Sequence, residues 1–191
     1  CGAVMYTVYN RTFVLIGGGL MQDYRSKTCC FSGYRIEKMP FGADDLRAVQ
    51  ALEAMLDSVV HAAAARGYTR FLSGMSTGFD LWAAEAVLRA REQAPVQLLC
   101  AVPFDKQADR YPADWKRRFN HCLLAADQVY ALSRRYFAGC YAARNRFIVD
   151  ASSLLICYFD GRPGGTAQTV RMAEQSGLEI INLAMHQLKL F

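Results

Sequence analysis

The chain has 191 residues, a length typical of one domain. Hydrophobic residues make up 53% of the chain and charged residues 20%, which excludes a disordered chain, a collagen-like chain and a coiled-coil rod. The formal net charge of +5 suits an anionic small ligand as well as it suits nucleic acid. The longest apolar run, residues 13–21, is far shorter than the roughly 20 residues that cross a bilayer, so we expect a soluble protein that does not enter a membrane.

The cysteines indicate a reducing compartment. Their number, seven, is odd, and most of them lie in apolar segments, where thiols behave as small hydrophobic groups. No Cys-x-x-Cys pair occurs, and none of the three histidines stands at metal-ligand spacing from a cysteine. We therefore expect a cytoplasmic protein with no metal site.

The N-terminal residues differ from the rest of the chain. Residues 1–20 include an apolar run that imitates the core of a signal peptide, but no small-residue cleavage site follows it. We interpret residues 1–26 as an N-terminal extension, with Met21 as a candidate natural start, and residues 27–191 as a single domain.

Strand-like and helix-like segments alternate in the first half of this domain. Residues 28–31 predict a strand, and a helix follows that is capped by Asp44 or Asp45 and ends at Gly67. Its apolar residues repeat at helical spacing: Leu46, Val49, Leu52, Leu56, Val59 and Ala63. The next elements are a strand over residues 68–72, a helix over 77–92 and a strand over 96–102.

The second half continues the alternation. The expected elements are a helix over residues 115–125, a strand over 129–132, a helix over 136–150, a strand over 154–159, a helix over 166–175 and a strand over 179–183. Six strands that alternate with helices predict an α/β fold, in which a doubly wound, mainly parallel sheet of about six strands carries helices on both faces.

The loops that follow the strands are the expected ligand site. In doubly wound sheets, ligands bind outside the carboxyl ends of the strands, where the strand order reverses. Glycine and polar residues gather in these loops: Ser32, Gly33, Tyr34, Arg35, Gly74, Thr77, Gly78, Asp80, Pro103, Phe104, Gly164, Gly165 and Thr166. This distribution predicts a binding edge.

The turn between the second strand and its helix has more than one interpretation. Gly74 and Gly78 bracket a turn that opens into a helix, whose unpaired N–H groups and dipole would attract a phosphate. The alternative is a capping box in which Thr77 and Asp80 bind backbone donors. Asp80 also suits a ribose hydroxyl, and Glu85 would face either the ligand or a salt-bridge partner.

Two further segments carry alternatives. Gly164, Gly165 and Thr166 precede a helix and suit either a phosphate cradle or an ordinary strand-to-helix loop. Arg144 and Arg146 lie within a predicted helix, where such charges are typical of a solvated basic face.

The ordered set of motifs resembles the YpsA-type family, a bacterial group within the SLOG superfamily of Rossmann-like proteins. The motifs are Ser32-Gly33-Tyr34-Arg35, Gly74-x-x-x-Gly78-x-Asp80-Leu81-Trp82-Ala83-Ala84-Glu85, Pro103-Phe104-x-x-Gln107, Arg144-Asn145 with Asp150, and Gly164-Gly165-Thr166. The resemblance runs from about residue 28 to 183. The superfamily also includes the Lonely Guy phosphoribohydrolases and the DNA-processing protein DprA.

The resemblance implies a Rossmann-like fold and a pocket for a nucleotide or nucleotide-derived ligand of the ADP-ribose, NAD or nucleoside monophosphate type. It implies that Glu85, Arg144 and Asn145 line this pocket together with the glycine and polar loop residues named above, and it implies a homodimer. The Lonely Guy enzymes carry P-G-G-x-G-T-x-x-E, but Ala167, Gln168 and Arg171 replace the third glycine, the threonine and the glutamate. The carboxylate at the ribosyl centre is therefore missing at that place.

Three functional hypotheses follow. The first, which we prefer, is a sensor or signalling component that binds a nucleotide-derived ligand. The second is an N-glycosidic hydrolase in which Glu85 or Asp80 supplies the acidic group. The third is a single-stranded DNA-binding protein that resembles DprA, which we rank lower because the arginines are spread over three predicted helices and the net charge is modest.

Overall fold

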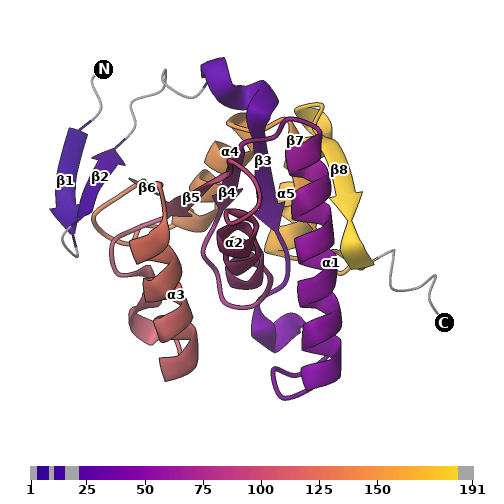
Figure 1. The fold of residues 1–191 in the computed structure, drawn as a ribbon. Helices are drawn as coiled ribbons and strands as arrows, with labels where there is room; N and C mark the ends of the chain where they lie inside the picture. Colours follow the sequence, from indigo (N-terminus) through magenta and orange to yellow (C-terminus); the bar gives the residue numbers. More distant parts are fainter. Residues whose placement is uncertain (1–3, 9–10, 16–21, 185–191) are drawn as a thin grey trace.

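A six-stranded parallel sheet forms the centre of the computed structural model, which describes residues 4–8, 11–15 and 22–184 (Figure 1). Its strands are β3 (Thr28–Ser32), β4 (Arg70–Ser73), β5 (Gln97–Val102), β6 (Gln128–Ala131), β7 (Leu154–Cys157) and β8 (Glu179–Asn182). Their order across the sheet is β6-β5-β4-β3-β7-β8. The predicted α/β fold is confirmed, with each of the six strands close to its predicted place.

Helices cover both faces of this sheet. One face packs against α1 (Leu46–Ala65), α2 (Phe79–Ala90) and α3 (Ala113–Ala125), and the other packs against α4 (Cys140–Asp150) and α5 (Gly165–Gln175). Along β3, Cys29 and Phe31 belong to the first core and Cys30 to the second, because successive side chains of a strand point to opposite faces. Because helices cover both faces, the central strands are mainly apolar rather than alternating, as in Leu154–Cys157, where every residue is buried.

The strand order reverses at the centre of the sheet. From β3 the chain moves outward through β4, β5 and β6, and it then returns to place β7 on the other side of β3. Cys29 pairs with Leu154 in this central parallel ladder. The chain leaves β3 towards the α1–α3 layer and leaves β7 towards α5 in the opposite layer, so a crevice is expected between the two loops.

The helix α1 shows how its sequence sets its ends and its buried side. The Asp45 side chain accepts a hydrogen bond from the Ala48 amide at 3.1 Å, which caps the N-terminus as predicted. The residues that reach the core are Val49, Leu52, Leu56, Val60 and Ala63. Val59 is half-buried and packs against the same core, whereas Leu46, the first residue of the helix, is 67% exposed, contrary to prediction.

Two helices begin later than their sequences predict. The N-cap of α2 is Gly78 and that of α4 is Gly139, with φ angles of +81° and +88°. Residues with such left-handed backbone cannot belong to a right-handed helix, so the preceding polar segments remain loops. These loops, residues 74–78 and 132–139, lie at the carboxyl edge of the sheet and contribute to the site described below.

The N-terminal extension holds a hairpin that the sequence analysis did not predict. Strands β1 (Val4–Val8) and β2 (Arg11–Leu15) pair antiparallel and form a separate two-stranded sheet. In Figure 1 this hairpin lies beside the edge strand β6. A short 3-10 helix, Gln22–Lys27, leads into β3. No helix in the described part of the chain is long and apolar enough to cross a membrane.

We expect Gly78→Ala to destabilise the fold more than Gly67→Ala. Both glycines have a positive φ, so each substitution should cost about 1–2 kcal/mol of backbone strain. A Cβ at position 78 would also lie 2.6 Å from the Ile36 amide nitrogen and 2.7 Å from the Tyr34 carbonyl oxygen, whereas one at position 67 meets no described atom within 4 Å. The crowding should add about 1–3 kcal/mol. Urea unfolding of the two variants measures the difference, and equal losses would contradict this packing.

Candidate functional site

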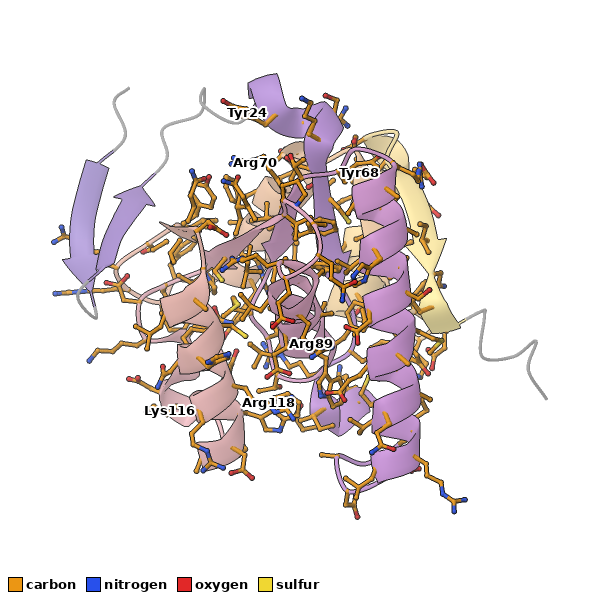
Figure 2. The ribbon with its side chains drawn as sticks, viewed as in Figure 1. Tyr24, Tyr68, Arg70, Arg89, Lys116 and Arg118 are labelled. Atoms are coloured by element: carbon orange, nitrogen blue, oxygen red, sulfur yellow. The ribbon has the colours of Figure 1, made fainter. Side chains whose placement is uncertain are left out.

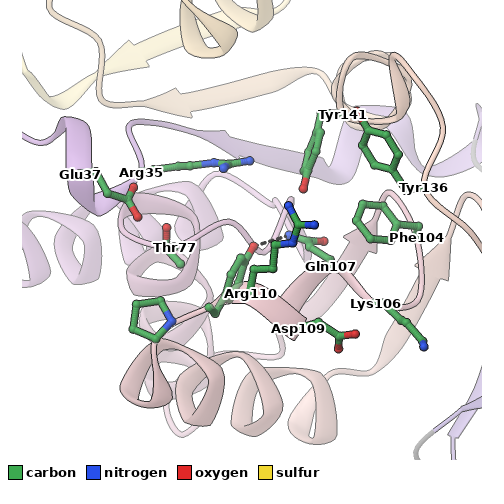
Figure 3. Close-up of a pocket in the computed structure, with 12 residues that line it drawn as sticks. Arg35, Glu37, Thr77, Phe104, Lys106, Gln107, Asp109, Arg110, Tyr136 and Tyr141 are labelled. Carbon is green, nitrogen blue, oxygen red and sulfur yellow. Dashed lines mark hydrogen bonds between the residues drawn. The ribbon is translucent and has the colours of Figure 1, made fainter.

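Two cavities open at the carboxyl edge of the sheet. The smaller, of about 310 Å³, lies at the reversal of strand order, and the residues that line it are Phe31, Ser32, Gly33, Tyr34, Arg35, Lys38, Ser76, Asp80, Tyr141, Arg144, Asn145, Ile148, Pro163, Gly164, Gly165 and Thr166. The larger, of about 680 Å³, is drawn in Figure 3, and its lining is Arg35, Glu37, Thr77, Phe104, Lys106, Gln107, Asp109, Arg110, Tyr111, Pro112, Tyr136 and Tyr141. Because Arg35 and Tyr141 line both cavities, the two cavities are adjacent.

Most of the sequence-predicted ligand residues gather around these cavities. Those that line the smaller cavity are Ser32, Gly33, Tyr34, Arg35, Asp80, Arg144, Asn145, Gly164, Gly165 and Thr166. Thr77 and Phe104 line the larger cavity, together with Arg35. Those that line neither cavity are Gly74, Gly78, Pro103 and Glu85. The predicted residues therefore converge from the loops after β3, β4, β5 and β7 and from α4.

The N-terminus of α5 faces the smaller cavity. Its N-cap is Gly164, with φ +150°, and a Cβ added at Gly165 would meet no described atom within 4 Å. The Lys38 ammonium lies 3.8 Å from the place where a Gly164 Cβ would be. The first N–H groups of a helix have no acceptor within the helix, and its dipole favours negative charge there. This end of α5 therefore combines open space, backbone donors and a cation.

The turn into α5 is tied to the loop after β3. The Thr166 hydroxyl donates a hydrogen bond to the Gly33 carbonyl at 3.0 Å. The Tyr34 hydroxyl donates to Asp160, and Arg162 bonds to the Asp160 carboxylate and to the Lys38 carbonyl at 3.0 Å. Hydrogen bonds from Arg162 lower the pKa of Asp160 to about 2. The two loops that flank the smaller cavity are thus linked by charged and neutral hydrogen bonds.

The N-terminus of α2 is closed, unlike that of α5. The Phe79 amide donates to the Tyr34 carbonyl at 3.1 Å, and the Ser76 amide approaches the Asp80 carboxylate at 3.4 Å. The alternative capping box also does not form, because the N-cap is Gly78 rather than Thr77 and no side chain caps it. The loop after β3 and its backbone acceptor therefore occupy the N-terminus of α2, where the glycine turn predicted a phosphate.

Asp80 and Arg144 form a buried ion pair beside the smaller cavity. Arg144 Nη1 lies 3.7 Å from Asp80 Oδ2, and the two side chains are 5% and 7% exposed. Arg144 also donates to the Gly74 carbonyl and, at 3.2 Å, to the Ser76 hydroxyl. A Cβ at Gly74 would collide with the Arg144 guanidinium, so glycine is required there to admit the arginine rather than a phosphate.

The prediction of a solvated basic face is wrong for Arg144 and fits its neighbour Arg146. Arg146 is 45% exposed and pairs with Asp150 on the same helix at 3.7 Å. Helical spacing alone does not distinguish the two residues, because burial of Arg144 depends on the turn after β4, which lies far away in sequence. The Arg144-Asn145 motif of the resemblance was the signal that singled out the buried residue.

Burial shapes the electrostatics of the pair. It raises the pKa of the Asp80 carboxyl, which the Arg144 guanidinium opposes, and it lowers the pKa of Arg144, which Asp80 opposes. Asp80 Oδ1 and Arg144 Nε have no hydrogen-bond partner among the described residues. A buried acceptor and a buried donor without partners are costly, and both belong to residues that line the smaller cavity. A hydroxyl-bearing ligand could satisfy such groups.

Glu85 takes the salt-bridge alternative. Its carboxylate lies 2.5 Å from Arg118 on α3, and Arg118 also approaches Glu53 on α1 at 4.0 Å. Burial raises the pKa of Glu85, and Arg118 lowers it. Figure 2 shows Arg118 and Arg89 between α3 and α1, in front of α2. Glu85 therefore links α2 to α3 through its ion pair with Arg118, and it lines neither cavity.

The larger cavity combines Gln107, which belongs to one of the quoted motifs, with residues that the sequence does not indicate as ligand residues. Gln107 donates to the Met75 carbonyl at 2.9 Å and to the Tyr111 hydroxyl at 2.8 Å, and Tyr111 donates to the same carbonyl at 3.1 Å. These bonds hold Met75 in a left-handed conformation, with φ +61°. Burial raises the pKa of Tyr111 to about 12. The other residues missed were Lys38, Lys106, Arg110, Tyr136 and Tyr141.

Their position after the strands is a sequence signal that would have identified most of these residues. They lie in the loops that follow β3, β5 and β6 or in the first turn of α4, hence at the same edge as the predicted glycines. In the described part of the chain, no group of three or more His, Cys, Asp and Glu side chains is placed to hold a metal ion.

Comparison with known families identifies the chain. The YpsA family model, described as YspA SLOG family, matches residues 29–189. The chain belongs to the YpsA SLOG family.

Sequence relatives of this YpsA SLOG protein come from bacilli. The UPF0398 protein BH1768 of Halalkalibacterium halodurans is 25% identical over 153 residues, which cover 78% of this chain and 81% of that protein. The UPF0398 protein OB1025 of Oceanobacillus iheyensis is 28% identical over 144 residues, which cover 73% of this chain and 78% of that protein.

Two solved structures of DNA processing protein A share the fold. The protein from Streptococcus pneumoniae has a TM-score of 0.57 at 18% identity, and the match covers 82% of this chain but only 50% of that protein, so the chain spans about half its length. The protein from Helicobacter pylori, whose structure concerns its single-stranded DNA binding mode, has a TM-score of 0.58 at 17% identity over 90% of this chain and 71% of that protein.

We expect Arg144→Gln to destabilise this YpsA SLOG protein by about 3–5 kcal/mol, because the change leaves the Asp80 carboxylate buried without its charged partner. The matched control is Arg146→Gln on the same helix, whose exposed pair should contribute about 0.3–0.5 kcal/mol. Chemical unfolding at pH 7 measures both. The Arg144→Gln loss should shrink at lower pH, because a carboxyl whose pKa is raised by folding begins to destabilise the protein as the pH rises above its unfolded-state pKa, and the full penalty is reached only above the folded-state pKa. Similar losses in the two variants would contradict the buried pair.

We expect Arg162→Gln to raise the pKa of Asp160 from about 2 towards the ordinary value of about 3.9. A folded-state pKa below the unfolded one means that Asp160 stabilises the fold above about pH 4 and that this contribution is lost as the pH falls towards 2. NMR titration of the Asp160 carboxyl carbon measures the shift. Arg171→Gln, which removes an exposed arginine that bonds to its own helix, should leave the titration unchanged. An unshifted Asp160 in Arg162→Gln would contradict the Asp160–Arg162 pairing within the loop after β7.

Proposed function

We propose that this protein binds a nucleotide or nucleotide-derived ligand, of the ADP-ribose, NAD or nucleoside monophosphate type, in the smaller cavity. The observation that carries the proposal is the N-terminus of α5, which opens into this cavity where the strand order reverses, with Gly165 leaving room for an anion. The ligand phosphate would accept hydrogen bonds from the first amides of α5 and would neutralise Lys38.

The polar groups deeper in the cavity suit a ribose. Asp80 Oδ1 is an acceptor without a partner among the described residues, and a sugar hydroxyl can donate to it. Asn145 lines the same cavity and offers both a donor and an acceptor. The lining of the cavity therefore combines a cation and helix amides with carboxylate and amide side chains, the groups that a sugar phosphate can use.

The geometry favours binding over hydrolysis. Asp80 is the one acidic residue in the lining of the smaller cavity, and its other oxygen is engaged by Arg144 and by the Ser76 amide. Glu85, the second candidate for an acidic role, is paired with Arg118 outside the lining. General acid catalysis at a glycosidic bond needs a carboxyl within hydrogen-bond reach of the leaving group. We therefore assign a sensor or signalling role rather than a hydrolytic one.

Single-stranded DNA binding is the second candidate. The Helicobacter pylori protein that shares this fold binds single-stranded DNA, and the larger cavity here combines arginine, lysine and aromatic side chains. Two acidic residues, Glu37 and Asp109, line the same cavity and reduce its positive charge. This mixture suits a small ligand better than a polyanion.

We expect nucleotides to stabilise the wild-type protein in thermal unfolding, by about 2.7 kcal/mol at a concentration 100 times the dissociation constant. The panel is AMP, ADP, ATP, NAD, ADP-ribose, ribose 5-phosphate and a short DNA strand. Gly165→Val places a side chain over the first amides of α5 and should abolish this stabilisation while leaving the fold intact. Ala167→Val, two residues further along the same helix and outside the cavity lining, is the matched control.

The possible results separate the three functions. Stabilisation that Gly165→Val removes and Ala167→Val retains supports nucleotide binding at α5. Release of free base during incubation with AMP would establish a hydrolase. Stabilisation by the DNA strand alone, with a steep dependence on salt, would establish the second candidate. Equal stabilisation of Gly165→Val and wild type would refute the assigned phosphate position.

A further inference from the structure

The two cavities meet at one pair of side chains. The Arg35 guanidinium lies 5.1 Å from the centroid of the Tyr141 ring, and both residues line both cavities. Tyr141 lies in the first turn of α4, one turn before Arg144. A ligand with its phosphate at α5 and its sugar beside Asp80 would therefore reach the Arg35–Tyr141 pair with its next group, at the entrance to the larger cavity.

The wall of the larger cavity beyond this pair is aromatic. Phe104 makes edge-to-face contacts with Tyr141, at 6.1 Å between ring centroids, and with Tyr136, at 5.6 Å. Tyr136 is 66% exposed, although it packs on Phe104. Figure 3 shows these three rings grouped on one side of the cavity. An exposed aromatic ring beside a cavity can stack on a planar ligand group.

Polar groups in the lining of the same cavity can bond to the edge of a planar ligand group. Gln107 is 3% exposed, and its Nε2 group donates to Met75 and to Tyr111, whereas its Oε1 atom has no partner in the described part of the chain. Figure 3 shows Arg110 reaching into the same space. A heterocyclic base carries both a flat face and N–H groups at its edge, so it can use the rings and the unpaired acceptor together.

We propose that the larger cavity is the base subsite of the nucleotide whose phosphate binds at α5. The inference rests on the proposed function and names how the ligand lies: the phosphate at Gly165, the ribose beside Asp80, and the base past Arg35 and Tyr141 against Phe104 and Tyr136. Affinity then depends on a base as well as on a sugar phosphate, which distinguishes nucleotides from simple phosphorylated sugars.

Calorimetric titration with ribose 5-phosphate and with AMP, GMP, CMP and UMP tests the proposal. At least one nucleotide should bind the wild-type protein more tightly than ribose 5-phosphate does. Tyr136→Leu should weaken that nucleotide by about 10-fold, the effect of losing one base–aromatic stack, and should leave ribose 5-phosphate unchanged. The matched control is Phe137→Leu, the neighbouring exposed aromatic residue, which lines neither cavity and should change neither affinity.

Each contrary result has a distinct meaning. If all nucleotides bind no more tightly than ribose 5-phosphate, or if Tyr136→Leu has no effect on the nucleotide, the base subsite is refuted while phosphate binding at α5 stands. If Tyr136→Leu and Phe137→Leu weaken the nucleotide equally, the effect is not specific to the cavity and the base subsite is again refuted. If neither ribose 5-phosphate nor any nucleotide binds, the proposed function itself fails.

Discussion

The buried pair of Asp80 and Arg144 is the constraint on which the carboxyl edge of this protein depends. Asp80 belongs to the helical layer on one face of the sheet and Arg144 to the layer on the other, so the pair joins the two layers across the edge. Removing two charges from water is costly, and only close pairing with further hydrogen bonds offsets that cost. Gly74 must therefore lack a side chain, and its carbonyl and the Ser76 hydroxyl must turn towards the guanidinium.

This constraint determines which helix end remains available to an anion. The turn that receives Arg144 also brings the α2 N-terminus against the loop after β3, where backbone carbonyls and Asp80 use its donors. The α5 N-terminus is held differently, through the Thr166 hydroxyl and the Asp160–Arg162 link, which leave its first amides directed at the cavity. Two glycine turns that look equivalent in sequence therefore differ in structure: the loop after β3 packs on the N-terminus of α2, whereas the N-terminus of α5 lines the smaller cavity.

The sequence predicts the parts of this structure that depend on local pattern. Mainly apolar runs predict the strands, because parallel strands buried on both faces need no polar side, and Asp45 and Gly67 mark the ends of α1. Gly164 and Gly165 lie, as predicted, at the carboxyl edge of the sheet, where the smaller cavity opens. Burial of Arg144 and the meeting of Tyr111, Tyr136 and Tyr141 in one cavity could not be predicted from pattern, because each depends on loops brought together by the strand order. The resemblance to the YpsA-type motifs indicated Arg144 but none of these three tyrosines.

The charge distribution of the smaller cavity supports the proposal that it binds a nucleotide rather than cleaving one. Where the Lonely Guy motif has its glutamate, this chain has Arg171, which is exposed and bonds to the Ala167 carbonyl of its own helix. The carboxylate that remains at the smaller cavity, Asp80, is balanced by Arg144, and the surrounding cations are Arg35 and Lys38. A preorganised positive edge stabilises a bound phosphate, whereas a developing ribosyl cation would need negative charge at the same place. With Arg171 in place of that glutamate and Asp80 paired with Arg144, the lining of the smaller cavity holds no unpaired carboxylate residue to stabilise such a cation.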